Sequence, residues 1–323
     1  MLAVQVHEFG DPDVLRLERV QDPVPGPGQV LVAVRAAGVN PVETYVRGGL
    51  GIHPPLPYTP GSDAAGVVVA AGAGVADVAP GDRVYTHGSL SGTYAELALC
   101  DAQQVSPLPE PLDFAAGAAI GVPYATAHHA LFARGRARRG ETVLIHGAAG
   151  GVGIAAVQLA AAAGLRVIGT ASTAEGRRLV LSEGASHALD HASPEHGEEL
   201  LELTGGGVDL IVEMRSDVNL GGDLRLLAPR GRVLCVGNRG PQNQGEVSVN
   251  ARELMRREGD ILGVMLTESD PAQLAVLHAE LAAGFRSRAL RPAVSRSYPL
   301  AEAAAAHRDI AGGHTIGKLV LVP

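Results

Sequence analysis

The segment His146–Gly153, which reads HGAAGGVG, has the composition of a phosphate-binding loop. Gly147, Gly150 and Gly153 recur every third residue, and Gly151 adds a fourth glycine. Glycines let the backbone approach a pyrophosphate closely, and a helix that begins within them offers free N–H groups and a positive dipole end. The segment follows an apolar β-rich run and precedes a helical pattern, as a dinucleotide-binding loop requires. The alternative is a tight turn that packs a helix on a strand.

The residues after the next expected strand indicate which dinucleotide is bound. An NAD site usually carries Asp or Glu about 20 residues beyond the loop, where it binds the ribose 2′-hydroxyl. Here residues 169–173 read GTAST and contain no acid. Ser172 and Thr173 can donate hydrogen bonds to a 2′-phosphate, and Arg177 and Arg178 can supply positive charge. The pattern favours NADP(H), although each arginine could instead lie on a solvated helix face.

The histidines and cysteines do not show the spacing of a metal site. A catalytic zinc needs about three converging protein ligands, and the sequence has neither HExxH nor CxxC. His187 and His191 are four apart but lie on either side of an expected strand. With only Cys100 and Cys235, a disulfide framework and an all-cysteine zinc site are excluded. We therefore expect no bound metal.

Strands alternate with helices through the middle of the chain, which predicts a parallel, doubly wound sheet of the dinucleotide-binding kind. The expected strands are 142–147, 166–171, 186–190, 208–214, 231–237 and 260–266. The expected helices lie within 151–164, 173–183, 194–203 and 271–284, with another that leads to Leu227.

The first 110 residues alternate between apolar and polar positions and are interrupted by Pro and Gly clusters, which predicts an antiparallel β-rich domain. Residues 113–135 are Ala-rich and helical in pattern, and would connect the two domains. Residues 298–313 predict one helix, and 318–323 predict a last strand that returns to the first domain. The expected strands of this domain are 14–20, 29–38, 64–72, 82–88 and 93–100.

Composition limits the partners of the chain. A net charge of −8 and a pI of about 5.8 weigh against a broad basic footprint for nucleic acid or membrane. Aromatic residues are 3% and tryptophan is absent, so no stacking platform for single-stranded nucleic acid is evident. The uncharged stretch 143–165 is interrupted by glycines, and we expect no membrane span. The N-terminus MLAVQVHEFG lacks the pattern of a signal peptide, and we expect a cytoplasmic protein.

Several stretches together resemble the zinc-independent quinone oxidoreductases of the medium-chain dehydrogenase/reductase superfamily, most closely the ζ-crystallin type. Zinc-dependent relatives carry a cysteine shortly after the GVN region and a GHE motif later; here these regions read Asn40-Pro41-Val42 and Gly61-Ser62-Asp63. The matching stretches are 38–49, 56–68, 81–99, 117–131, 141–160, 208–214, 218–224 and 231–240.

The resemblance implies an α/β fold with a Rossmann domain and a GroES-like β-rich domain. Residues 1–117 and 285–323 would form the GroES-like catalytic domain, and 118–284 the Rossmann domain, with the active site in the cleft between them. It also implies a homo-oligomer, because dimers and tetramers both occur in the family.

The resemblance also assigns site residues. Tyr45 would lie against nicotinamide and substrate, and Asn40 would line the same cleft. Ser172 stands where the family has glycine, and 48–54 lacks a second tyrosine that the family carries. Together with Arg177, the residues implied to hold NADP(H) are Tyr45, Thr126, Ala149, Gly150, Gly151, Val152, Ser172, His191, Asn219, Val236, Gly237, Asn238, Arg239, Val264, Met265 and Leu266.

The chemistry implied is reduction of a quinone by NADPH, in which the protein supplies position and electrostatics. The quinone oxygen gains negative charge, so a hydrogen-bond donor beside it helps. The Tyr45 hydroxyl and the Asn40 amide are the candidate catalytic donors, although Asn40 could instead cap a helix that begins at Pro41. One-electron reduction of ortho-quinones to semiquinones and two-electron hydride transfer both stay open. The alternatives are an NADPH-dependent alkenal or enone double-bond reductase and an NADPH-sensitive RNA-binding protein.

Overall fold

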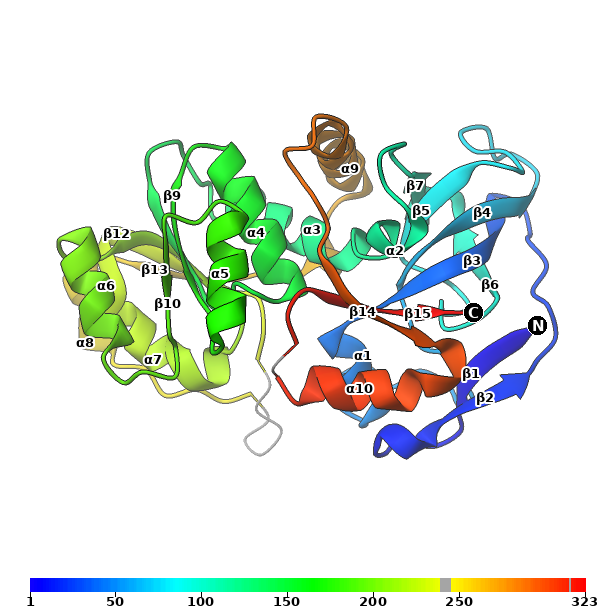
Figure 1. Ribbon diagram of the computed structural model, residues 1–323, viewed down its shortest axis with the longest axis horizontal. Helices are drawn as coiled ribbons and strands as arrows, with labels where there is room; N and C mark the ends of the chain where they lie inside the picture. Colours follow the sequence, from blue (N-terminus) through cyan, green and yellow to red (C-terminus); the bar gives the residue numbers. More distant parts are fainter. Residues whose placement is uncertain (239–244, 314) are drawn as a thin grey trace. The chain divides into compact units, whose positions relative to one another are not determined.

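The computed structural model describes residues 1–238, 245–313 and 315–323. The chain divides into two compact units (Figure 1). The first unit contains Met1–Val122 and Ala282–Pro323, and the second contains Pro123–Leu281. The first unit is therefore built from both ends of the chain.

The second unit contains a six-stranded sheet in which every strand pairing is parallel. The strand order is β10-β9-β8-β11-β12-β13, which is the order of a dinucleotide-binding Rossmann fold, so the predicted doubly wound sheet is confirmed. The strands are β8 Thr142–Ile145, β9 Arg166–Thr170, β10 His187–Leu189, β11 Val208–Glu213, β12 Leu227–Cys235 and β13 Asp260–Gly263.

Helices follow these strands as a doubly wound topology requires. The core between them is apolar and includes Leu144, Ile168, Ile211 and Leu224. A short helix, α8, was not predicted because its sequence ARELMRR is polar and spans less than two full turns. The helices are α4 Gly151–Ala162, α5 Ala174–Ser182, α6 His196–Thr204, α7 Ser216–Leu226, α8 Ala251–Arg257 and α9 Pro271–Arg286.

The first unit contains a seven-stranded sheet built around its longest strand, β3. This strand pairs antiparallel with β4, β6 and β15, so the predicted β-rich domain and the return of the last strand are both confirmed. A separate pair, β1 and β2, is also antiparallel. The strands are β1 Leu2–Val6, β2 Leu15–Arg19, β3 Gln29–Val39, β4 Asp63–Ala71, β5 Arg83–His87, β6 Leu97–Asp101, β7 Val105–Pro107, β14 Val294–Pro299 and β15 Lys318–Val322.

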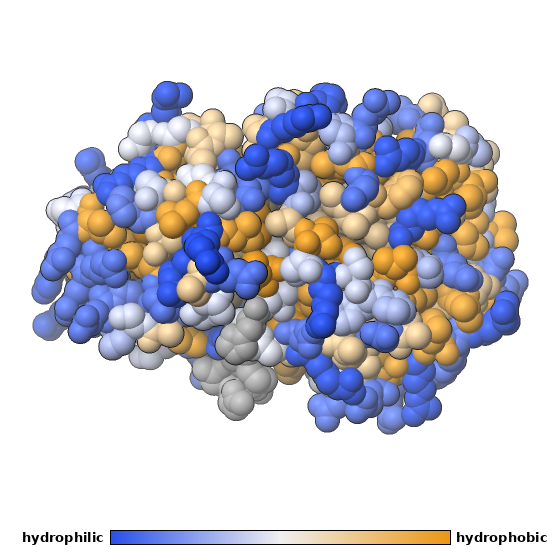
Figure 2. Space-filling view, viewed as in Figure 1, coloured by the Kyte–Doolittle hydropathy of each residue, from blue (hydrophilic) through white to orange (hydrophobic). Residues whose placement is uncertain are grey.

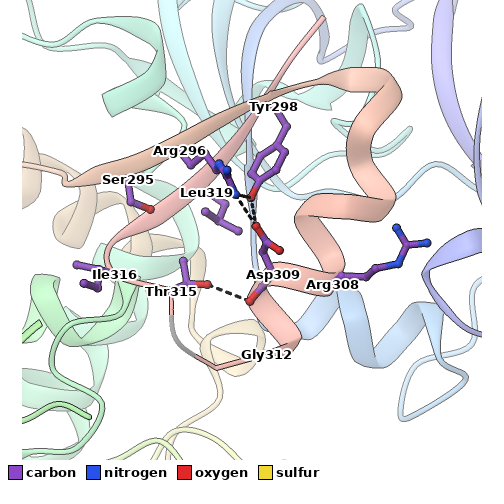
Figure 3. Close-up of a pocket in the computed structure, with 9 residues that line it drawn as sticks. All are labelled: Ser295, Arg296, Tyr298, Arg308, Asp309, Gly312, Thr315, Ile316 and Leu319. Atoms are coloured by element: carbon purple, nitrogen blue, oxygen red, sulfur yellow. Dashed lines mark hydrogen bonds and ion pairs between the residues drawn. The ribbon is translucent and has the colours of Figure 1, made fainter. Parts of the chain in front are cut away.

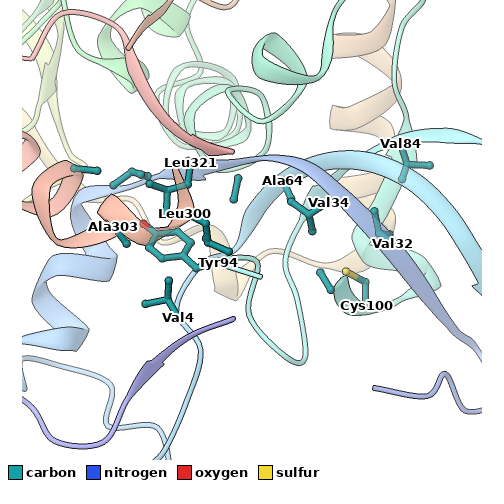
Figure 4. Close-up of a cluster of buried hydrophobic side chains, with 14 of the residues drawn as sticks. Val4, Val32, Val34, Ala64, Val84, Tyr94, Cys100, Leu300, Ala303 and Leu321 are labelled. Atoms are coloured by element: carbon teal, nitrogen blue, oxygen red, sulfur yellow. The ribbon is translucent and has the colours of Figure 1, made fainter. Parts of the chain in front are cut away.

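One apolar core unites strands from both ends of the chain in this unit. Val4, Val34 and Ala64 from the N-terminal part pack with Leu300 and Leu321 from the C-terminal part (Figure 4). Burial of apolar surface is the main stabilising term in such a core. The C-terminal tail is therefore part of the folded unit.

Two predicted helices differ from the structure. The helix expected from Tyr298 begins only at Ala303, as α10 Ala303–Ala311, because Tyr298 and Pro299 end β14, which pairs parallel with β15. A residue before proline is disfavoured in helical conformation, which explains the late start. The expected helical segment 113–135 is broken into α2 Phe114–Gly117, α3 Gly121–His128 and the π-helical turn His129–Arg134.

Among the described residues, no helix has both the length and the apolar character needed to cross a bilayer. On the face shown in Figure 2, hydrophilic side chains are interspersed with hydrophobic ones.

Candidate cofactor and substrate site

The glycine loop lies where the sequence predicted, between β8 and α4. Gly150 is the N-cap residue of α4, and Gly147 has a φ of +57°, a conformation that glycine adopts at little cost. A Cβ at Gly153 would lie 2.3 Å from the Gly147 carbonyl oxygen and 2.6 Å from Ala148 Cα. The helix thus begins in direct contact with the loop, and its free N–H groups suit a phosphate.

Most of the other residues assigned to the cofactor follow the carboxyl ends of parallel strands. These ends share one edge of a parallel sheet, which is where ligands bind in this fold. Asn219 lies on α7 and Thr126 on α3, while Arg239 lies outside the described residues. The residues that follow strand ends are Ala149, Gly150, Gly151 and Val152 after β8, Ser172 after β9, His191 after β10, Val236, Gly237 and Asn238 after β12, and Val264, Met265 and Leu266 after β13.

The region predicted to receive the 2′-phosphate contains an ion pair. The Nη1 atom of Arg177 lies 2.8 Å from the Asp190 carboxylate and donates to the Ala171 carbonyl oxygen at 3.2 Å. Thr173 is the N-cap of α5, and its hydroxyl oxygen accepts from the Gly176 amide at 3.0 Å. The carboxylate of Asp190, which the sequence analysis did not consider, therefore shares the guanidinium of Arg177.

A cluster that sequence reasoning missed lies directly before the glycine loop. His146 Nε2 lies 3.0 Å from Asp223 Oδ1 and 3.5 Å from Glu213 Oε2. Their ligand-type atoms all lie within 4.8 Å of one another, the one such group among the described residues. His146 is far in sequence from the other two residues, and the pairing of β8 with β11 brings it beside them. The sequence feature that could have indicated this cluster is Glu213, an acidic residue at the end of the apolar strand β11.

In the first unit, Tyr45 lies on α1 Pro41–Arg47 and is half-buried, and Asn40 is the N-cap residue of that helix. The Asn40 amide nitrogen donates to Asp63 at 2.9 Å and to Glu43 at 3.2 Å, and its oxygen accepts from Lys318. Both N–H bonds of the amide are thus used within the protein. The structure thus places Asn40 as a helix cap, which was the alternative considered for it in the sequence.

Lys318, the only lysine of the chain, is 4% exposed and lies 2.9 Å from the Asp63 carboxylate. The strand register explains this placement. Leu319 of β15 pairs with Val39 of β3, so the preceding Lys318 lies opposite Asn40. Sequence reasoning did not identify Lys318, although a lone lysine at the start of an apolar strand was visible.

Glu43 completes this network. Its carboxylate accepts from the Asn40 backbone amide at 2.6 Å and from the Tyr94 hydroxyl at 2.8 Å. Burial raises the pKa of Glu43, while the nearby Lys318 ammonium opposes the shift. Because the Tyr94 hydroxyl donates to Glu43, the His307 Nε2 atom at 3.1 Å must donate to the Tyr94 oxygen. The network therefore fixes α1, which carries Tyr45, by its first turn.

A surface depression of the first unit contains none of the predicted site residues (Figure 3). It lies between β14, α10 and the start of β15. On its wall, Asp309 accepts from Arg296 at 2.8 Å and from the Tyr298 hydroxyl. We assign it no part in the cofactor site.

Comparison with known proteins identifies the family. Residues 26–110 match the alcohol dehydrogenase GroES-like domain, and residues 151–281 match the zinc-binding dehydrogenase family. A Rossmann unit joined to a GroES-like unit of this kind defines a medium-chain dehydrogenase/reductase. The chain is 45% identical over 328 residues to quinone oxidoreductase of Mus musculus, covering 100% of this chain and 98% of the relative. It belongs to the quinone oxidoreductase family of this superfamily, of the ζ-crystallin type, as the sequence resemblance indicated.

Solved structures agree with this assignment. A mycobacterial protein complexed with NADPH has a TM-score of 0.91 and 33% identity, with full coverage of both chains. Quinone oxidoreductase of Escherichia coli, also complexed with NADPH, has a TM-score of 0.91 and 29% identity over the full length of both chains.

Proposed function

We propose that this chain is an NADPH-dependent, zinc-independent quinone reductase. The observation that carries the proposal is the full-length relation to proteins named quinone oxidoreductase, because the fold alone hosts many reactions. The glycine loop at the start of α4 supports dinucleotide binding. The absence of an acid at the end of β9, where Thr170, Ala171 and Ser172 stand, supports NADPH over NADH.

The second unit would hold the cofactor. The free N–H groups at the start of α4 would bind the pyrophosphate, and Ser172 and Arg177 would bind the 2′-phosphate. To do so, the Arg177 guanidinium must share its charge between the phosphate and Asp190. Bound NADPH would supply the electrons for the reduction.

The first unit would supply the donor to the quinone. We assign this role to the Tyr45 hydroxyl, because the Asn40 amide is fully engaged by Asp63, Glu43 and Lys318. A hydrogen bond to the oxygen that gains negative charge favours the reduction. Asn40 is then a positioning residue that holds the start of α1.

The test follows the absorbance at 340 nm with NADPH or NADH in the presence of 9,10-phenanthrenequinone, a para-naphthoquinone or a short enone. Each reaction is run with and without a chelator. Quinone turnover that prefers NADPH and resists the chelator is the expected result. Turnover of the enone alone would instead identify a double-bond reductase, and binding of NADPH without turnover would contradict the proposal.

Three further features belong to this proposal. A homo-oligomer and a cytoplasmic setting are inferred from the resemblance, and size-exclusion chromatography with light scattering tests the first.

RNA binding is disfavoured by the net charge of −8. A gel-shift assay at low salt, with and without NADPH, tests that expectation.

A further inference from the structure

Three titratable side chains form a closed group at the carboxyl edge of the Rossmann sheet. We call His146, Glu213 and Asp223 the buried acid cluster. His146 follows β8, Glu213 ends β11, and Asp223 lies on α7. Their exposed fractions are 4%, 0% and 1%, so all three are buried from bulk solvent. No residue of this cluster was assigned a role in the proposed reaction.

The cluster contains two carboxylate oxygens without a hydrogen-bond partner among the described residues, Glu213 Oε2 and Asp223 Oδ2. The other oxygen of Glu213 accepts from the Arg215 backbone amide and from the Asn219 amide. Two ionised carboxylates this close would repel each other in a low dielectric. A single proton on one carboxyl group removes the repulsion and provides a donor for the other.

The cluster is linked to the glycine loop by short contacts. His146 directly precedes Gly147, and His146 Nδ1 lies 3.4 Å from the Thr170 hydroxyl. That same hydroxyl accepts from the Gly147 amide at 3.3 Å. Asn219, which the resemblance includes among the residues that hold NADP(H), donates to Glu213 at 3.2 Å. Few atoms therefore separate the loop from the cluster, so a charge bound at the loop changes the electrostatic potential at the two carboxyl groups.

We propose that the buried acid cluster is a proton-binding site coupled to the dinucleotide site, so that binding of NADPH takes up a proton onto the Glu213–Asp223 pair. This inference rests on the proposed NADPH binding. The phosphates of the dinucleotide bring negative charge to the loop, and negative charge favours the protonated form of a nearby carboxyl group. By linkage, the protonated protein must bind NADPH more tightly than the deprotonated one.

The direction of the effect follows from the groups that face the cluster. Burial raises the pKa of Glu213 to about 7 and that of Asp223 to about 7, so the pair titrates near neutral pH. Burial lowers the pKa of His146, so the ring stays neutral there. From β12, Cys235 has a raised pKa through burial and stays a thiol.

Among the described residues, His191, Arg215 and Asp217 are further charged or titratable groups near the cluster. After β10, desolvation lowers the pKa of His191, which faces Thr170 at 3.4 Å, so this ring is also neutral above pH 7. After β11, the Arg215 guanidinium is paired with Asp217 at 2.9 Å. Among the described residues near the loop, the Glu213–Asp223 pair is thus the group expected to change charge above pH 7.

The experiment measures the dissociation constant of NADPH between pH 6.8 and 9 by the fluorescence of the nicotinamide, which no tryptophan of this chain obscures. This range lies above the titration of a free phosphate monoester near pH 6. Calorimetry in buffers of different ionisation enthalpy counts the protons exchanged. We expect affinity to fall about tenfold across this range, a typical coupling strength, with net proton uptake near pH 7.

Glu213→Gln and Asp223→Asn each remove one titrating member while keeping its shape, and we expect either to abolish the uptake and flatten the pH profile. The matched control is Asp209→Asn. Asp209 lies on the same strand, β11, but at its opposite end, where its carboxylate accepts from the Thr142 amide at 2.7 Å. This variant should keep the uptake of the unmodified chain.

The outcomes separate the two proposals. NADPH binding without proton uptake in the unmodified chain, or uptake that survives both cluster variants, overturns the coupling and leaves the proposed function intact. A stoichiometric divalent metal in the purified chain also overturns it, because the cation would take the place of the proton. Failure to bind NADPH at any pH overturns both.

Discussion

At the scale of single residues, the candidate chemistry depends on one hydroxyl and on the buried network that fixes its helix. Tyr45 lies on α1, whose first turn is held by Asn40 and Glu43. Asn40 is in turn held by Lys318 and Asp63. The residue that donates to the substrate is therefore distinct from the residues that hold its helix. Substitution of the donor should lower the reaction rate, whereas substitution in the supporting network should lower the free energy of unfolding.

Tyr45→Phe removes the hydroxyl and keeps the ring. We expect kcat/KM for the quinone to fall at least tenfold, because a donor beside a developing negative charge is lost. The loss should exceed any change in the dissociation constant of NADPH. Steady-state rates at 340 nm and NADPH titrations measure the two. Equal losses in both would show that Tyr45 serves cofactor binding alone.

Lys318→Met leaves the buried Asp63 carboxylate without its cation. Breaking a buried ion pair by removing one partner costs about 3–5 kcal/mol, and we expect a loss of this size in the free energy of unfolding. Urea unfolding followed by circular dichroism measures it. The double variant with Asp63→Asn should recover part of the loss, and no recovery would argue against the pair as its cause.

At the scale of elements, the loop that opens α4 was predictable and the start of α10 was not. The spacing of the glycines and the helical pattern that follows them depend on neighbouring residues only, so both could be predicted from the sequence. The late start of α10 depends on Tyr298 packing within β14, which pairs with a strand from the end of the chain. The buried acid cluster required the strand order β8-β11, which no local pattern of His146, Glu213 or Asp223 encodes.

Gly153→Ala tests the close approach between α4 and the loop. The added Cβ would meet backbone atoms at 2.3–2.8 Å, so the loop must move. We expect NADPH affinity to fall at least tenfold, measured by fluorescence titration. Gly222→Ala is the control, because at this helical position of α7 the added Cβ would meet no atom within 4 Å apart from its chain neighbours and its own helix backbone, and the variant should gain slight stability. Equal affinity in both variants would contradict the tight loop.

At the scale of the whole molecule, we expect two buried histidines to make the first unit less stable in acid. Burial lowers the pKa of His307 to about 3 and that of His87 to about 4. Both groups bind protons more readily in the unfolded chain, whose histidines titrate near 6.5. The stability that they contribute is present above pH 6.5 and is lost as the pH falls from 6.5 toward these lower values.

His307→Gln should reduce this acid sensitivity, because glutamine can still donate to Tyr94 and has no proton to gain. Between pH 6.5 and 4, we expect the variant to lose roughly 3 kcal/mol less stability than the unmodified chain. Urea unfolding at a series of pH values measures the difference. Parallel pH profiles for the two proteins would exclude His307 as a source of the acid sensitivity.

The pairing of the last strand, β15, with β3 has a consequence for synthesis of the chain. Residues 123–281 form a unit with no strand from either end, so this unit can complete its sheet while the chain is still being made. The first unit must wait for Lys318–Val322, which are made after the whole of the second unit. Until then Ala37–Val39 of β3 lack the partner strand β15, and Asp63 lacks its cation. A chain that stops a few residues early should thus release a folded Rossmann unit attached to an incomplete, aggregation-prone β unit.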